Sequence, residues 1–283
     1  MPAHRDLDFR GGVAVITGAA SGIGAALALQ LATRGCHLAL VDVNDAGLQV
    51  TAAQAGARGI TVSRHVLDLA QPESAAELLA AVNAAHGRVR VLVNNAGVAL
   101  GGNFEQVAAA DFDWLMSINF GAVVRLSRAF LPLLTAEPAA QLVNVSSIFG
   151  IIAPPGQTAY CAAKFAVRGF SESLRHELET AGSTVGVTLV HPGGVRTAIA
   201  ENSRAPQDAS QADLAQAKAA WRRMLVLPAE DAAARIVRGI ERREPRVLVG
   251  KDAVRAAWVQ RLFPVGYWKL VARDIARRMA KTN

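Results

Sequence analysis

Residues 13–24 read VAVITGAASGIG, an apolar run of strand type that leads into a glycine-rich turn. Residues 25–33, which follow, have the composition of a helix. Glycine at positions 18, 22 and 24 lets backbone N–H groups approach a pyrophosphate at the helix N-terminus, because any Cβ there would hold the phosphate away. The stretch therefore predicts a strand, a phosphate-binding turn and a helix, although such a turn in isolation could also only reverse the chain.

Further apolar runs of strand type alternate along the chain with segments of helical composition. These runs lack polar alternation, as in a parallel sheet that helices cover on both faces. The expected strands are 13–17, 37–41, 60–65, 89–93, 141–146, 185–191 and 246–249. The expected helices are 25–33, 72–85, 111–134, 158–180 and 229–242. We predict an α/β fold of Rossmann type, a doubly wound parallel sheet of seven strands with helices on both faces.

Asp42 lies at the end of the second expected strand, eighteen residues after Gly24. A carboxylate at this place accepts hydrogen bonds from the ribose hydroxyls of adenosine and repels a 2′-phosphate. Val43 and Asn44 are not basic, and position 21 in the turn is a serine, so no cation neutralises the extra charge of NADP. The residues favour NAD(H) over NADP(H), although Asp42 could instead only cap the next helix.

Tyr160 and Lys164 lie one helical turn apart on the same face of the expected helix 158–180. A phenol with a free pKa of about 10 is a poor base near neutrality, and a nearby ammonium favours the phenolate. The pair therefore predicts an acid/base group whose charge state depends on the lysine.

Several motifs, in order over roughly residues 10–250, resemble those of the short-chain dehydrogenase/reductase family. They are TGAASGIG at 17–24, Asp68-Leu69, Asn94-Asn95-Ala96-Gly97, Ser147, the Tyr160 and Lys164 pair, and Pro192-Gly193 with Val195 and Thr197. The family's spacing of thirteen residues before the tyrosine selects Ser147 over Ser146. The catalytic residues that the resemblance implies are Asn119, Ser147, Tyr160 and Lys164. The cofactor-binding residues that it implies are Gly18, Ser21, Gly22, Ile23, Gly24, Asp42, Asp68, Leu69, Asn95, Ala96, Gly97, Tyr160, Lys164, Pro192, Gly193, Val195 and Thr197.

By this resemblance, Tyr160 exchanges the proton of an alcohol while a hydride passes to or from NAD(H). Ser147 would hold the substrate oxygen, and Lys164 would lower the tyrosine pKa and bind the nicotinamide ribose. Asn119 would anchor a water that relays the proton. The apolar residues 148–156 suggest an apolar secondary alcohol or ketone, or a primary alcohol or aldehyde. The alternative function is a catalytically silent NAD(H)-binding sensor, or a membrane-recruited binding protein, on the same fold.

The domain organisation is inferred from how the composition changes along the chain. No linker or internal repeat divides residues 1–250, so we expect a single Rossmann-fold catalytic domain there. Within it, the polar segment 198–227 is expected to form a helical flap over the substrate site. Residues 251–283 are expected to form a basic amphipathic C-terminal extension.

The net charge of +7 is unevenly distributed along the 283 residues. Residues 235–283 hold thirteen Lys and Arg against four Asp and Glu, a local +9, which leaves −2 for residues 1–234. The segment with recognisable chemistry is thus nearly neutral, which argues against nucleic acid as the main partner. The extension could pack on the body or another subunit, contact a membrane surface, or meet nucleic acid or another acidic partner.

Other features concern location, metal and assembly. Two cysteines, the absence of long apolar runs and the lack of an apolar N-terminal segment indicate a cytoplasmic protein, with a peripheral membrane contact left open. The histidines lack metal-ligand spacing, so no metal site is expected. Small residues in the expected helix 158–180, in the family's usual oligomer interface, favour a homodimer or homotetramer.

Overall fold

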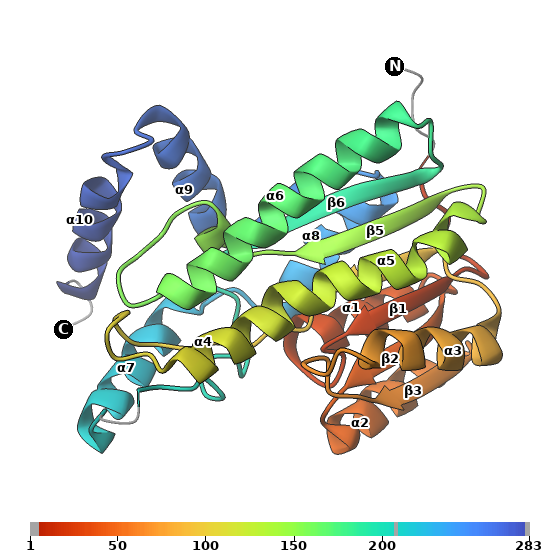
Figure 1. Ribbon diagram of the computed structural model, residues 1–283, viewed down its shortest axis with the longest axis horizontal. Helices are drawn as coiled ribbons and strands as arrows, with labels where there is room; N and C mark the ends of the chain where they lie inside the picture. The colour runs from red at the N-terminus through yellow and green to blue at the C-terminus, as the bar shows by residue number, and fades with distance from the viewer. Residues whose placement is uncertain (1–5, 207–208, 281–283) are drawn as a thin grey trace.

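The computed structural model describes residues 6–206 and 209–280, which are built around a parallel sheet of seven strands (Figure 1). The strand order is β3-β2-β1-β4-β5-β6-β7. The order reverses between β1 and β4, and α/β sheets bind ligands at such a reversal, at the carboxyl ends of the strands. This arrangement confirms the predicted Rossmann-type fold.

The strands lie close to their predicted positions. They are β1 (Val13–Thr17), β2 (His37–Asp42), β3 (Val62–Val66), β4 (Val91–Asn94), β5 (Ala140–Val145), β6 (Val185–Pro192) and β7 (Arg246–Val249). The predicted bounds of β1 and β7 match, and the others differ by one or two residues at an end. Every residue of β1, β4 and β5 is buried, which explains their lack of polar alternation.

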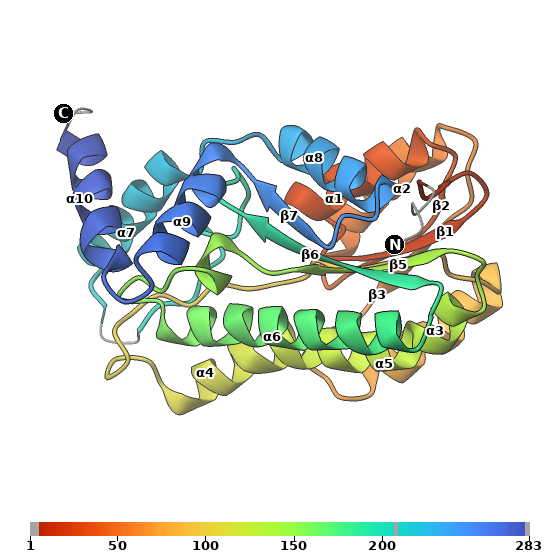
Figure 2. The same ribbon diagram turned by 90° about the horizontal axis from the view of Figure 1, so that it is seen from above.

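Helices cover both faces of the sheet, as Figure 2 shows. On one face lie α1 (Gly22–Ala32), α2 (Asp45–Gly56) and α8 (Ala229–Glu241). On the other lie α3 (Ser74–His86), α4 (Ala109–Met116), α5 (Ala122–Thr135) and α6 (Thr158–Thr180). Neighbouring strand residues serve opposite faces: Ile16 belongs to the core cluster of α1 and α8, whereas Val15 belongs to that of α3 and α5.

Two helical segments differ from the prediction. The segment predicted as one helix over 111–134 is divided into α4 and α5 by a π-helical turn, Ser117–Gly121, which carries Asn119. Such turns insert one extra residue into a helix and redirect its side chains, which hydrophobic periodicity does not reveal. Helix α2 was not predicted; it begins after Asn44, whose side chain accepts a hydrogen bond from the N–H of Gly47.

The remaining helices lie at the carboxyl edge of the sheet (Figures 1 and 2). Helix α7 (Gln211–Met224) lies within the predicted flap, and α9 (Lys251–Leu262) and α10 (Tyr267–Ala280) follow β7. Within the described residues, no helix combines the length and apolarity needed to cross a membrane. The division of the chain at residue 250 stays a prediction.

Candidate active site

The glycine-rich turn between β1 and α1 has the geometry that its glycines permit. Gly18 and Gly22 have positive φ angles of 66° and 56°, which side chains disfavour. A Cβ on Gly24 would collide with the carbonyl oxygen of Gly18, and a Cβ on Gly18 would lie 2.9 Å from Cα of Ala96. The turn is therefore folded tightly against its own helix and against the end of β4.

The first turn of α1 is suited to an anion. Its N-cap residue, Ser21, makes no capping side-chain hydrogen bond in the described structure, and no acidic residue lies in the first turn. The N–H groups there, at Ser21, Gly22 and Ile23, are the ones that a pyrophosphate binds at a helix N-terminus. These residues fit a dinucleotide, as the sequence predicts.

The end of β4 supports this turn through its polar groups. The N–H groups of Asn95 and Ala96 each donate to Oγ1 of Thr17 at 3.0 Å. The side chain of Asn95 donates to the Thr17 carbonyl at 2.9 Å. Asn95 and Ala96, predicted to contact the cofactor, therefore also position the glycine turn.

Asp42 is the last residue of β2, and Asp68 lies in the loop that follows β3. The Asp42 carboxylate accepts from the N–H of Ala20 at 3.0 Å and from that of Asn44 at 3.1 Å. This fixes the carboxylate beside the glycine turn, where the sequence predicts the adenosine ribose. Asp68 accepts from the N–H of Ala70 at 2.9 Å, and its neighbour Leu69 is buried.

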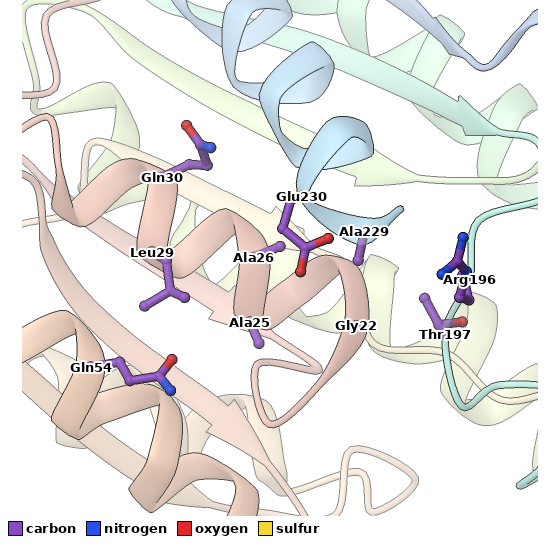
Figure 3. A pocket seen from close by; sticks show the side chains of 10 residues that line it. All are labelled: Gly22, Ala25, Ala26, Leu29, Gln30, Gln54, Arg196, Thr197, Ala229 and Glu230. Carbon is purple, nitrogen blue, oxygen red and sulfur yellow. The ribbon is translucent and has the colours of Figure 1, made fainter. Parts of the chain in front are cut away.

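The loop after β6, residues 193–197, closes the other side of the turn. A Cβ on Gly22 would lie 2.9 Å from Cγ2 of Thr197. Figure 3 shows a hollow beside α1, with Arg196 and Thr197 facing Gly22 at one end. None of the four predicted catalytic residues lines this hollow. It therefore flanks the cofactor-binding turn and is separate from the catalytic group.

The predicted serine and tyrosine are brought together at the end of β5. The Ser147 hydroxyl accepts from the N–H of Phe149 at 3.1 Å and lies close enough to the Tyr160 phenol to lower its pKa. The Ser146 hydroxyl instead donates to the carbonyl of Lys164 at 2.9 Å and is buried. This geometry favours Ser147 over Ser146 for contact with a substrate.

The charge states of Tyr160 and Lys164 depend mainly on burial. Burial raises the pKa of Tyr160 to about 12, and the nearby Ser147 hydroxyl opposes that rise. Burial lowers the pKa of Lys164 to about 8. The Lys164 ammonium lies 5.6 Å from the centre of the Tyr160 ring and donates to the Val145 carbonyl at 3.1 Å. In the protein alone, burial thus outweighs the lowering of the tyrosine pKa that the sequence predicts.

Asn119, on the π-helical turn, is the fourth of the predicted catalytic residues. Its amide oxygen accepts from the N–H of Val98 at 2.8 Å, and its amide nitrogen donates to the Val98 carbonyl at 2.9 Å. A Cβ on Gly97 would lie 3.2 Å from the Asn119 amide oxygen and 3.5 Å from Nζ of Lys164. Gly97 therefore keeps the space between Asn119 and Lys164 clear, and each amide atom of Asn119 retains capacity for one further bond.

Three residues outside the predicted catalytic and cofactor-binding sets also shape the site. His191 donates from Nδ1 to the Ser147 carbonyl at 2.8 Å, and burial lowers its pKa to about 3. Phe149 packs edge-on against Tyr160, with 6.1 Å between the ring centres. Asp252, on α9, accepts from the N–H of Gly194 at 2.7 Å. His191 could have been noticed in the sequence as a polar residue in a buried strand. The contact of Asp252 could not, because its partner lies 58 residues away.

Known proteins resemble this chain in both sequence and structure. Residues 12–208 match the family model described as short chain dehydrogenase. The SadH protein of Mycobacterium tuberculosis is 43% identical over 269 residues, 95% of this chain and 97% of SadH. The oxidoreductase UcpA of Salmonella typhimurium is 36% identical over 227 residues, 78% of this chain and 84% of UcpA.

Two solved structures of this class carry nucleotide cofactors. A short-chain dehydrogenase/reductase of Burkholderia phymatum in complex with NAD has a TM-score of 0.83 and 32% identity, over 90% of this chain and 94% of that one. A metagenomic short-chain oxidoreductase in complex with NADP has a TM-score of 0.69 and 30% identity, over 86% and 98%. Both structural similarities therefore extend over more than four fifths of this chain.

Proposed function

Since the chain belongs to the short-chain dehydrogenase/reductase family of oxidoreductases, we propose that it interconverts an apolar alcohol and its ketone or aldehyde with NAD(H). The observation that carries the proposal is the meeting of Ser147 and Tyr160 at the end of β5, with Lys164 5.6 Å from the tyrosine ring. Those are the groups that hold a substrate oxygen and exchange its proton.

The cofactor would bind where the strand order reverses, beside the N-terminus of α1. The N–H groups of Ser21, Gly22 and Ile23 would bind the pyrophosphate, and Asp42 the adenosine ribose. Asp68 with Leu69 would contact the adenine. The nicotinamide side would lie against the segments 95–97 and 192–197, beside Tyr160 and Lys164. When bound, the nicotinamide supplies the hydride donor or acceptor.

The preference for NAD(H) is supported by Asp42. Both of its oxygens are held by backbone N–H groups, so the carboxylate cannot easily turn away from a 2′-phosphate. The two solved relatives bind different cofactors, one NAD and the other NADP. The preference therefore depends on Asp42 and on the lack of a basic residue at positions 43 and 44.

Proton transfer is assigned to Tyr160 and orientation to Ser147. The Ser147 oxygen already accepts from Phe149, so its own proton can be donated toward a substrate oxygen. Tyr160, whose pKa burial raises to about 12, is a protonated phenol at neutral pH and can donate to a developing alkoxide. Alcohol oxidation needs the reverse transfer, which the Lys164 ammonium assists when it is charged.

The substrate side is apolar. Ile148, Phe149, Ile151 and Ile152 follow Ser147, and Trp221 on α7 packs against Phe149 with 5.8 Å between ring centres. Apolar residues beside Ser147 would favour an apolar substrate over a charged one, because a charge would lose its hydration without a partner.

The test is to follow NADH absorbance across a panel of secondary alcohols, sterols and aliphatic alcohols, with NADP⁺ in parallel. Turnover with NAD⁺ is expected, and Tyr160→Phe should lower kcat by roughly 10²- to 10⁴-fold because it removes the acid/base group. A silent panel with tight NADH binding would favour the sensor alternative. Faster turnover with NADP⁺ would contradict the role assigned to Asp42.

A further inference from the structure

The end of the C-terminal hairpin exposes several large apolar side chains. We call this surface the hairpin tip, and it consists of Val254, Trp258, Leu262, Phe263, Val265 and Leu270. Val254, Trp258 and Leu262 follow one another at intervals of four residues and form one stripe along α9. Trp258 is 61% exposed, Leu262 65% and Val265 93%. Adjacent apolar residues exposed to this degree usually mark a binding surface.

Exposed basic side chains lie on the same two helices, α9 and α10, as the hairpin tip. Exposed basic side chains there are Lys251, Arg255, Arg261, Lys269 and Arg273. Asp252 is the one acidic residue between positions 251 and 273, and its carboxylate is turned inward to the N–H of Gly194. The surface therefore combines apolar and cationic groups with no exposed acid between positions 251 and 273.

The hairpin is held firmly on the body of the protein. Ala253 and Ala256 of α9 are buried. Tyr267 of α10 accepts through its hydroxyl from the N–H of Ala153 at 2.9 Å, and it packs with Ile151 and Ile152. A surface fixed in this way loses little conformational freedom on binding, which favours association.

We propose that the hairpin tip binds the surface of an anionic lipid bilayer. Tryptophan and phenylalanine favour the boundary between headgroups and acyl chains, and lysine and arginine beside them attract acidic headgroups. A second copy of the chain fits less well, because a two-fold interface would bring like charges together. Nucleic acid would leave the stripe of Val254, Trp258 and Leu262 without an apolar partner.

The experiment is co-sedimentation of the full-length protein with vesicles of phosphatidylcholine, with and without phosphatidylglycerol. Binding is expected with the anionic vesicles and should weaken as salt is added. Val265→Asp should weaken it by about tenfold or more, since the substitution places a charge in the apolar contact. Val50→Asp is the matched control, because Val50 lies on α2 and is 59% exposed. It should bind as the wild type does.

A second variant, Trp258→Ser, tests the stripe on α9 by the same assay and should also bind more weakly. Circular dichroism then establishes that each variant is folded. The proposal is overturned if the wild type does not bind anionic vesicles, or if Val265→Asp and Trp258→Ser bind as well as Val50→Asp. It is also overturned if these variants change only the oligomer size in solution, since the tip would then be a subunit interface. The assay needs no turnover, so it is independent of the proposed function.

Discussion

The two ends of the site are built by different means. At the α1 end the backbone forms the site: Gly18, Gly22 and Gly24 shape the turn. The N–H groups that follow in the first turn of α1 are the ones predicted to bind the pyrophosphate. At the substrate end, side chains make contacts between distant segments, as the Phe149 ring does with Trp221 and the Asp252 carboxylate does with the N–H of Gly194. The difference shows that a short motif can specify a backbone site, whereas a side-chain site depends on the whole fold.

After Tyr160→Phe, the largest expected effect is at the side-chain end, where two neighbouring serines test the comparison. Ser147→Ala should lower kcat by roughly 10²- to 10³-fold, the usual loss when one donor to the reacting oxygen is removed. Ser146→Ala should instead cost stability of about 1 kcal/mol, because its hydroxyl bonds the Lys164 carbonyl. Steady-state kinetics and urea unfolding of both variants separate these effects. Equal losses of kcat would contradict the assignment of Ser147.

A smaller effect is expected at the backbone end. Gly24→Ala places a Cβ against the Gly18 carbonyl and 2.7 Å from the side-chain nitrogen of Asn95. Because such overpacking costs about 1–3 kcal/mol, NADH binding should weaken by about 10- to 100-fold. Fluorescence titration with NADH measures this. Gly56→Ala on α2 is the control, since a Cβ there meets nothing within 4 Å. An equal loss of NADH affinity in both variants would refute a specific role for the turn.

The same contrast decides how much the sequence could predict. The sheet, its order of strands and helices, and the glycine turn follow from patterns within a few residues, and the fold was predicted correctly. The π-helical turn at Ser117–Gly121 and the contacts of Phe149 and Asp252 were not, because each depends on packing between segments far apart. The pKa of Tyr160 also depends on burial, which spacing to Lys164 does not reveal.

His191 supports the substrate end through the Ser147 carbonyl, and its burial predicts a pH dependence of stability. Burial lowers its pKa from 6.5 to about 3 in the folded protein, so between those values the unfolded chain binds the extra proton. The contribution of His191 is complete above pH 6.5 and decreases as the pH falls toward 3, by about 1.4 kcal/mol per pH unit. His191→Gln keeps a donor for the Ser147 carbonyl and should flatten this slope in urea unfolding at several pH values. His176→Gln, at an exposed position, should leave the slope unchanged.

The smallest expected effect lies where the C-terminal hairpin meets the substrate side. Tyr267→Phe keeps the ring among Ile151, Ile152 and Val271 but removes the hydroxyl that accepts from the N–H of Ala153. One such hydrogen bond contributes about 1 kcal/mol, so urea unfolding should show a loss of that order with kcat little changed. If the hairpin also orders the loop that follows Ser147, KM for the alcohol should rise while KM for NAD⁺ does not. A change in kcat alone would contradict this division, because Tyr267 contacts the loop and none of the four predicted catalytic residues in the described structure.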